Sequence, residues 1–333
     1  MDLSIIICCY RGEKTIEECL KSLCSQSYNN QKYEVIIIDD DSIDNSSKLI
    51  NSFLKKNKDQ YPNFKYFKKE NRGLSVARNF GVTKAKSALI SFIDEDAKAD
   101  KDFVANVINT FESNPTINCL GGKVKLWNKH DYFAKIYHYG YFNAMMSNGA
   151  IIGTNMSFRK NFLNDVGGFI PEFDKRGDES ALFFKAKSKL SKTVSDKIII
   201  HHMQPNSKEI FFSIRNKNGS IQYLYEKLSL SHGFSILGIH IRPLFHFSFI
   251  ILPILAMISY LISYVIFFIF FGLFALILLT RFFVLGHLTK PLKFLQKSEI
   301  KKSIKDYLFL SWIVVYGYFQ EDLGYVRIKL FGK

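Results

Sequence analysis

The first hundred residues alternate short apolar runs, rich in β-branched residues, with segments whose apolar residues recur at helical spacing. The apolar runs cover residues 3–9, 33–38, 64–67 and 88–93. The helical segments between them cover residues 13–23, 46–54 and 74–85. Strands that alternate with helices build a parallel sheet with helices on both faces. The sequence therefore predicts a doubly wound α/β domain, in which ligands bind beyond the carboxyl ends of the strands.

Acidic residues cluster at the ends of two of these runs, although the chain has a formal net charge of +15. Residues 39–41 (Asp-Asp-Asp) follow the second run, and residues 94–96 (Asp-Glu-Asp) follow the fourth. Carboxylates held close together repel one another unless solvent or a cation lies between them. Aspartates after a strand are also typical of ordinary turns. Asp94 and Asp96 can nevertheless hold one hard divalent ion and leave coordination positions for water and phosphate oxygens.

A basic segment that contains glycine lies between the two acidic clusters. Residues 71–81 (NRGLSVARNFG) supply glycine for close backbone approach, the start of a helix and guanidinium groups that pair with phosphate. Acids for a base and a ribose, cations for a diphosphate and a metal ion between them are the parts of a nucleotide-diphosphate site. The three segments together predict such a site at the carboxyl edge of the sheet.

Beyond residue 102 the alternation of strands and helices weakens. The pattern predicts helices over residues 103–111 and 179–189, and strands over residues 119–126 and 197–201. His201 and His202 stand at the end of the last strand. Adjacent residues of a strand point to opposite faces, so two such histidines cannot easily share one metal ion. We therefore favour ordinary strand residues over a histidine metal site.

The most apolar part of the chain is residues 243–280, which contain no Lys, Arg, Asp or Glu. As one helix this run would be much longer than the roughly 30 Å hydrocarbon core of a bilayer. We therefore predict two membrane spans, over residues 243–259 and 263–280. Basic residues flank the run on both sides, which places both of its ends in the cytoplasm. A buried helical hairpin of a soluble core is the alternative.

A further apolar stretch, residues 307–319, is too short to span a bilayer comfortably. We predict an interfacial or re-entrant helix there, with a hydrophobic core helix as the alternative. Composition thus divides the chain into a first domain of residues 1–235, a transmembrane helical hairpin of residues 236–286, and a basic segment with the interfacial helix at residues 287–333. The first apolar run is too short for a signal peptide, and the five cysteines lack a CxxC pair. We expect a membrane protein whose first domain is cytoplasmic.

Four segments of the first hundred residues resemble the successive motifs of family 2 glycosyltransferases of the GT-A fold. They read SIIICCYRGEKTIEECLKSL, VIIIDDDSIDNS, NRGLSVARNFGVTKA and LISFIDEDAKAD. A later segment, GTNMSFRKNFLNDVGGFIPEFDKRGDESALFFKAK, resembles the acceptor-side block of the same family. The motifs together cover roughly residues 3–190. The resemblance implies a Rossmann-like α/β domain with a mostly parallel sheet that transfers sugar from a nucleotide-diphospho-sugar.

The resemblance also implies which residues bind this donor. Asp40 would be the partner of the nucleobase, and Arg78 would face the diphosphate. Cys9, with Tyr10 beside it, occupies the position where the family's backbone meets the base. Asp41 stands where the family commonly has glycine.

The acidic cluster after the fourth run would hold the metal ion of the family, Mg²⁺ or Mn²⁺. Asp96 becomes the principal ligand, and Asp94 a second ligand or a contact to the ribose. In membrane-anchored relatives a histidine near the position of His201 and His202 lies close to the diphosphate, so the resemblance gives one of this pair a place there.

The acceptor-side block supplies the sugar pocket and the catalytic base. Gly153, Thr154 and Asn155 would line the pocket. In the sequence GDES, the second acid matches the family's base. Glu179 therefore inherits that role, and Asp178 is the alternative.

The resemblance thus implies an inverting, metal-dependent glycosyltransferase of glycan or polysaccharide biosynthesis that uses a lipid-linked or saccharide acceptor. No QxxRW motif lies between residues 198 and 243, so transfer of a single sugar is favoured over processive synthesis. The alternatives are a transferase that makes a polyprenyl-monophosphate sugar and a non-catalytic membrane scaffold. A dehydrogenase is disfavoured because no GxGxxG follows the first run. Much of the positive charge flanks the apolar run, so we expect membrane lipids and no nucleic acid as partners.

Overall fold

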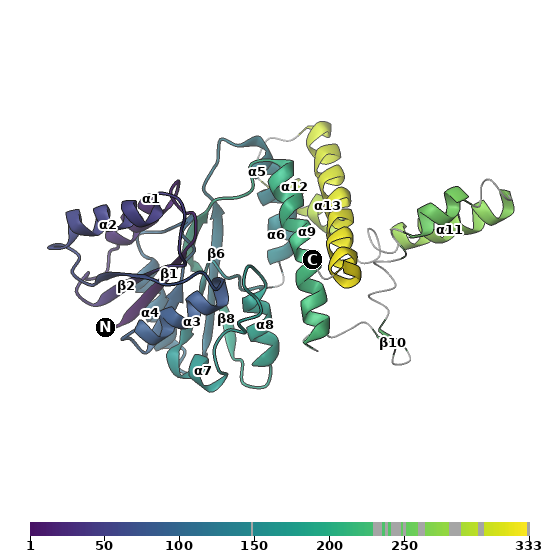
Figure 1. The fold of residues 1–333 in the computed structure, drawn as a ribbon. Coiled ribbons are helices and arrows are strands. Elements are labelled where there is room, and N and C mark those ends of the chain that lie inside the picture. Colours follow the sequence, from purple (N-terminus) through teal and green to yellow (C-terminus); the bar gives the residue numbers. More distant parts are fainter. Residues whose placement is uncertain are drawn as a thin grey trace. The chain divides into compact units, whose positions relative to one another are not determined.

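The computed structural model of the protein describes residues 1–147, 149–228, 235–236, 239–240, 248, 251–258, 264–279, 288–298 and 303–331. The chain divides into two compact units, whose elements Figure 1 labels along the chain. The first unit consists of Met1–Asn128 with Asn148–Met203, and the second of Lys129–Ser147 with Gln204–Lys333. The second unit is therefore made from two separate segments of the chain.

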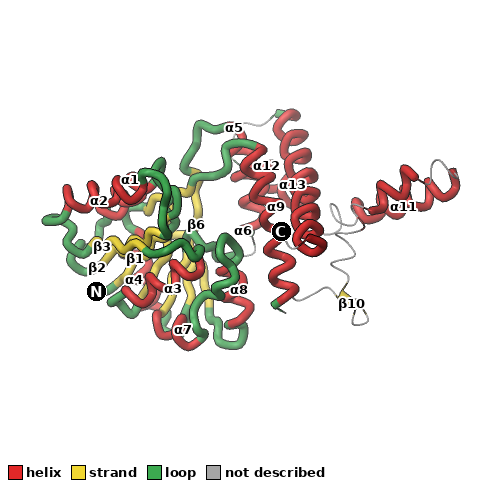
Figure 2. Tube along the Cα trace, viewed as in Figure 1, coloured by secondary structure: helices red, strands yellow, loops and turns green. Residues whose placement is uncertain are grey.

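The first unit is built on an eight-stranded mixed sheet in the order β3-β2-β1-β4-β7-β6-β8-β5, whose strands Figure 2 shows in yellow. The strands are β1 (Leu3–Cys9), β2 (Tyr33–Asp39), β3 (Phe64–Lys68), β4 (Leu89–Phe92), β5 (Ala97–Ala99), β6 (Cys119–Leu126), β7 (Met156–Arg159) and β8 (Lys192–His202). Neighbours from β3 to β4 are parallel, whereas β7 is antiparallel to both β4 and β6. The parallel strands β3, β2, β1 and β4 confirm the doubly wound arrangement predicted for the first hundred residues. The antiparallel pairing of β7 belongs to the part of the chain after residue 102, where the alternation of strands and helices weakens.

The helices of the first unit follow the strands as the periodicity predicts. They are α1 (Ile16–Cys24), α2 (Ser46–Asn57), α3 (Leu74–Lys84), α4 (Phe103–Ser113), α7 (Lys160–Asp165) and α8 (Asp178–Lys185). The predicted and observed ends of helices α1 to α4 differ by a few residues only. The predicted helix over residues 179–189 ends four residues earlier, at Lys185.

The central strands are mostly apolar because both of their faces are covered. Every residue of β1 and β2 is buried. Ile6 and Cys8 of β1 join a core cluster that includes Ala77 and Val82 of α3. Helix α3 therefore packs directly on the middle of the sheet.

Strand β1 is the point at which the order of the strands reverses. It pairs with β2 on one side and with β4 on the other, so the chain runs outward to β3 and returns across β1. Loops that leave neighbouring strands in opposite directions open a crevice between them. The carboxyl ends of β1, β2 and β4 consequently surround one space.

The second unit is mostly helical. Its elements are α5 (Tyr132–Ile136), a π-helix η1 (Tyr137–Phe142), α6 (Asn143–Met146), α9 (Lys208–Lys227), α11 (Tyr264–Leu279), α12 (Thr289–Lys297) and α13 (Ile304–Phe331), with the short strands β9 (Ser235–Ile236) and β10 (Ile239–His240). Helix α13 packs along α9 and buries Leu310, Ile313 and Val314. The buried Arg215 of α9 forms an ion pair with Glu321 of α13 and donates a hydrogen bond to the hydroxyl of Tyr141.

These units differ from the domains predicted from composition. The predicted first domain extends to residue 235, whereas the second unit begins at Gln204 and includes the inserted segment Lys129–Ser147. The cause is the packing of α9, whose Phe211 contacts the rings of Phe133 and Tyr137 at centroid distances of 6.2 and 5.3 Å. Such contacts between distant segments leave no mark in local composition.

The structure also bears on the predicted membrane spans over residues 243–259 and 263–280. Residues 251–258 and α11 are helical, and the remaining residues of both spans, apart from residue 248, lie outside the described residues. The 16 residues of α11 correspond to a helix of about 24 Å, shorter than the hydrocarbon core of about 30 Å. No helix in the described part of the chain is long and apolar enough to cross a bilayer, so the predicted spans are not supported.

One close contact sets the position of α3 on the sheet. A Cβ added at Gly81 would lie 2.5 Å from Cγ2 of Ile6, a branched atom close to the backbone of β1. Overpacking of this kind costs about 1–3 kcal/mol and exceeds the gain of about 1 kcal/mol in helix propensity. We expect Gly81→Ala to lower the free energy of unfolding by about 1–2 kcal/mol, measured by urea unfolding followed by circular dichroism. The exposed Thr83→Ala on the same helix should stay within about 0.5 kcal/mol, and an equal loss in both variants would contradict the assignment to this contact.

Candidate active site

A cavity of about 430 Å³ opens in the first unit at the carboxyl ends of β1, β2 and β4. The residues that line it include five predicted from the sequence, namely Cys9, Tyr10, Asp40, Asp94 and Asp96. The structure therefore brings together the predicted base-binding and metal-binding residues. The position agrees with the reversal of strand order at β1.

The carboxylate of Asp40 is held in place by the segment that precedes α3. It accepts hydrogen bonds from the backbone N–H groups of Arg72 (3.2 Å) and Gly73 (2.9 Å), and it pairs with the ammonium group of Lys69. Gly73 has a φ of 87°, and a Cβ there would lie 2.5 Å from Cβ of Asp174. The glycine is thus required for the close approach that fixes Asp40 at the edge of the cavity.

The next residue, Asp41, has a φ of 62°. This left-handed conformation is uncommon outside glycine, although aspartate tolerates it better than most residues. It gives a physical reason for the glycine that the resemblance leads one to expect at this position.

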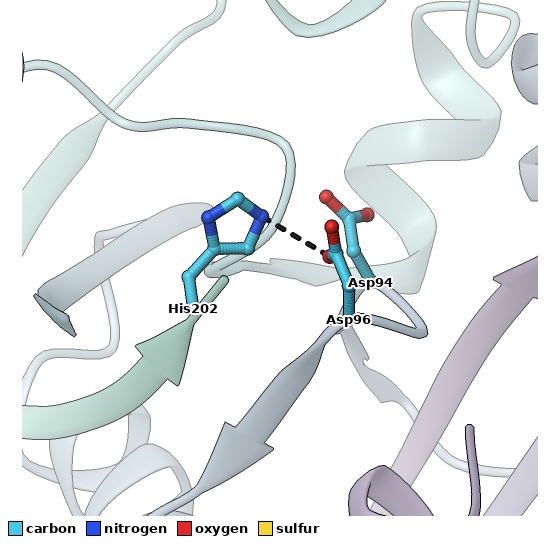
Figure 3. Close-up of side chains that lie close together, drawn as sticks. All are labelled: Asp94, Asp96 and His202. Atoms are coloured by element: carbon cyan, nitrogen blue, oxygen red, sulfur yellow. Dashed lines mark ion pairs between the residues drawn. The ribbon is translucent and has the colours of Figure 1, made fainter. Parts of the chain in front are cut away.

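A group of three side chains with the chemistry of metal ligands lies at the other side of the cavity mouth. One ligand atom from each of Asp94, Asp96 and His202 lies within 4.8 Å of the others. Figure 3 shows the imidazole of His202 directed at Asp96, with an Nε2–Oδ1 distance of 3.1 Å, and the carboxylate of Asp94 beside it. His202 reaches this place because β8 pairs antiparallel with β5 and sets His202 opposite Ala97.

His202 is the residue of this site that the sequence reasoning undervalued. Adjacent strand residues do point to opposite faces, but one histidine is enough to complete the group. Its neighbour His201 lies opposite Lys98 in the same pairing. The position of His202 depends on the pairing of β5 with β8, which joins residues about a hundred positions apart and has no local mark in the sequence.

The charges around this group favour a cation. Burial raises the pKa of Glu95 well above its ordinary value, and the charges of Asp96 and Asp94 raise it further. Burial also raises the pKa of Asp94, although the positive charge of Arg78 acts in the opposite direction. Two carboxylates and one imidazole suit Mn²⁺, and the carboxylates alone suit Mg²⁺. The donor set therefore fits the divalent ion that the resemblance implies.

Arg78 of α3 is buried beside this group rather than in the lining of the cavity. Its guanidinium donates hydrogen bonds to Asp94 (3.2 Å), to the carbonyl oxygen of Gly153 (3.2 Å) and to Asp178. The rings of Phe92 and Phe169 lie 5.7 and 5.6 Å from it. The predicted contact with a diphosphate stays a prediction, and the observed partners make Arg78 a link between the metal-binding group and α8.

The two candidate bases stand in the first turn of α8, where the helix dipole favours acids. Asp178 is buried and is committed to Arg78. Glu179 is half-buried, and burial followed by the charge of Asp178 raises its pKa to about 7. A carboxylate with such a pKa can accept a proton near neutrality, which favours Glu179 over Asp178 as a base.

Of the predicted sugar-pocket residues, Gly153 accepts a hydrogen bond from Arg78 through its carbonyl oxygen. Neither Gly153 nor Asn155 lines the cavity. The side-chain amide of Asn155 donates to the carbonyl oxygens of Lys123 (3.2 Å) and Ile198 (3.3 Å). Among the described residues, its Oδ1 and the hydroxyl of Thr154 are buried without a hydrogen-bond partner. Their role in sugar binding stays a prediction.

Comparisons with known proteins agree with this geometry. Residues 4–167 match the model of the family described as Glycosyl transferase family 2. The chain is 25% identical over 191 residues to glucosyl-dolichyl phosphate glucuronosyltransferase of Haloferax volcanii, which covers 54% of this chain and 59% of that protein. It is 32% identical over 176 residues to poly-beta-1,6-N-acetyl-D-glucosamine synthase of Staphylococcus epidermidis, which covers 50% of this chain and 41% of that protein. The chain thus spans about half the length of these curated relatives.

A solved structure supports the fold as a whole. The mannosyltransferase PcManGT from Pyrobaculum calidifontis, in complex with GDP-Man and Mn²⁺, superposes with a TM-score of 0.59 at 16% sequence identity. The match covers 100% of this chain and 88% of that chain. The likeness confirms the predicted GT-A-like α/β fold with a mostly parallel sheet.

The three-residue group predicts how divalent ions bind. We expect Asp96→Asn and His202→Ala each to weaken Mn²⁺ binding by at least about tenfold, measured by isothermal titration calorimetry with the metal alone. Asp174→Asn is the matched control, because Asp174 is an exposed acid in the lining of the same cavity but lies outside the group. A loss for Asp174→Asn as large as that for Asp96→Asn would show that general negative charge, and not this group, binds the ion.

Proposed function

Because residues 4–167 match the model of glycosyltransferase family 2, we propose that this protein transfers a single sugar from a nucleotide-diphospho-sugar to an acceptor hydroxyl with inversion at the anomeric carbon. One observation carries the proposal. A single cavity brings Asp40 together with Asp94 and Asp96, while Arg78 connects Asp94 to the first turn of α8, which carries Glu179. A donor site and a base of suitable pKa are thereby parts of one connected structure.

The donor is proposed to bind with its base at the Asp40 end of the cavity. The carboxylate of Asp40 is fixed by two backbone N–H groups, so it can accept a hydrogen bond from a nucleobase without reorganising. Cys9 and Tyr10 at the end of β1 line the same region. PcManGT was solved with GDP-Man, so guanosine and uridine donors both belong in a test.

We assign the divalent ion to Asp94, Asp96 and His202. When bound, it would offset the negative charge of the donor's diphosphate. Mn²⁺ is favoured over Mg²⁺ because an imidazole belongs to the donor set and because PcManGT was solved with Mn²⁺. Arg78 is a positioning residue in this scheme, since it holds the carboxylate of Asp94.

In the proposed reaction the acceptor oxygen attacks the anomeric carbon. The new glycosidic C–O bond forms as the bond from that carbon to the nucleoside diphosphate breaks, and the diphosphate leaves with the bonding electrons. The proton of the acceptor hydroxyl passes to the carboxylate of Glu179. A single displacement of this kind inverts the anomeric configuration.

We propose a lipid-linked acceptor. The support is the uncharged run of residues 243–280 and the name of the Haloferax volcanii relative, a glucuronosyltransferase of glucosyl-dolichyl phosphate. Transfer to a polyprenyl monophosphate itself is the close alternative. Its product would be labile to mild acid, because the sugar would be bound through a phosphodiester, whereas an added glycosidic bond would survive.

The decisive experiment is a screen of uridine- and guanosine-diphosphate sugars with Mn²⁺ or Mg²⁺, with release of the nucleoside diphosphate as the readout. We expect turnover of at least one donor, abolished by a chelator and restored by Mn²⁺. Binding of a donor without turnover, with lipid extracts supplied as acceptors, would support the non-catalytic scaffold instead. Turnover that is unchanged in the chelator would contradict the metal assignment.

The raised pKa of Glu179 predicts the pH dependence of the reaction. The base must be deprotonated, so kcat/KM should fall about tenfold for each pH unit below roughly 7. Glu179→Gln should lower kcat by about 10²–10⁴-fold and leave donor affinity nearly unchanged, since the donor contacts lie at Asp40 and the metal group. Steady-state kinetics and donor titration measure both effects.

Glu172→Gln, in the exposed segment before α8, is the control and should retain kcat. Asp178→Asn is a poor control because it leaves the buried Arg78 with one carboxylate fewer, a change that costs about 3–5 kcal/mol of stability. A Glu179→Gln variant with the kcat of the wild type would remove Glu179 from the role of base.

A further inference from the structure

The outer face of α13 carries a stripe of exposed apolar side chains. The stripe residues are Ile304, Leu308, Trp312 and Tyr316, whose exposed fractions are 79%, 66%, 44% and 39%. They are spaced by four residues, so their side chains follow one another along one side of the helix. Leu310, Ile313 and Val314 of the same helix are buried, and Leu310 lies against Gly140 of η1. Helix α13 is therefore a core helix on one face and an apolar surface on the other.

Aromatic rings form the middle of this stripe. Trp312 stacks on Tyr316 at a centroid distance of 6.0 Å, and Phe212 of α9 contacts both rings at 5.6 and 4.5 Å. The ammonium group of Lys208 lies 5.7 Å from the ring of Trp312. Tryptophan and tyrosine with nearby lysine are the residues that favour the boundary between hydrocarbon and water.

In the second unit the described cations are mainly exposed, whereas the acids of α13 are buried. Its exposed cations include Lys208, Lys293, Lys297 and Lys305. The acids Asp306, Glu321 and Asp322 of α13 are buried, and Glu209 is the one exposed acid among the unit's described side chains. Among the described side chains of this unit the exposed charges are therefore mostly positive, and Lys208 lies beside the stripe.

We propose that the stripe of α13 is a docking surface for an anionic lipid bilayer. Apolar residues of such a helix enter the boundary of headgroups and acyl chains, and each nearby lysine adds about 1 kcal/mol of attraction to an anionic surface. The helix lies along the membrane rather than across it, because the acids Asp306, Glu321 and Asp322 interrupt its apolar residues. The proposal rests on residues outside the active site, so it stands or falls independently of the proposed function.

The chain offers a local probe of this contact, because its two tryptophans lie in different units. Trp312 belongs to the stripe, and Trp127 lies in the first unit beside Lys98. In a full-length Trp127→Phe variant, Trp312 is the sole source of tryptophan emission. Vesicles of phosphatidylglycerol with acyl-chain-brominated lipids, compared with phosphatidylcholine vesicles carrying the same quencher, then report whether this ring meets the bilayer. Contact of other parts of the chain with the vesicle does not quench it.

We expect the anionic vesicles to shift the emission of Trp312 to the blue and to quench it, more strongly than the zwitterionic vesicles and less so at high salt. Leu308→Glu in the same background should reduce the quenching, and this exposed position does not threaten folding. The matched control is Trp312→Phe, whose remaining Trp127 should show no quenching. Absence of quenching, or equal quenching by both vesicle types, would overturn the proposal. Concentration-dependent emission without vesicles would overturn it in favour of a second copy of the chain.

Discussion

The buried guanidinium of Arg78 is the interaction on which the geometry of the active site depends. One cation binds a carboxylate after β4, a carboxylate at the start of α8 and a backbone carbonyl of the segment before β7. A buried charge is costly unless its partners compensate it, so the burial of Arg78 holds these three segments together. Asp94, a candidate metal ligand, and the first turn that carries Glu179 are thereby connected through Arg78, although Arg78 and Asp178 are a hundred residues apart.

Much of this arrangement could be predicted from the sequence, because its causes are local. Continuous apolar runs define β1 and β2, since a strand covered on both faces has no polar side to interrupt it. The meeting of Asp40 with Asp94 and Asp96 follows from strand order alone, since carboxyl ends of parallel neighbours share an edge. The alternating first hundred residues therefore predicted both the parallel part of the sheet and the position of the cavity at its carboxyl edge.

What could not be predicted depends on pairings between distant segments. His202 joins Asp96 only because β8 lies beside β5, and Arg78 is turned toward carboxylates by the position of α8. The apolar stretch from which a helix was predicted stops at residue 319, shortly before the acids Glu321 and Asp322. The helix continues to Phe331 because Arg215 neutralises Glu321 in the interior. The buried residues Leu310, Ile313 and Val314 agree with the core-helix alternative for this stretch, and the interfacial interpretation stays a prediction.

The insertion of residues 129–147 into the second unit has a consequence for the order in which the protein can fold during synthesis. Tyr132 and its hydrogen-bond partner Asp306 are separated by 174 residues. At elongation rates of about 5–20 residues per second, the earlier segment waits roughly 9–35 s for its partner. Once His202 has been made, all strands of the first unit's sheet are available, whereas the aromatic residues Phe133, Tyr137 and Tyr141 still lack the α13 surface that completes their core. The second unit is therefore the late-folding part of the chain. The nascent protein exposes these three aromatic side chains until α13 is made.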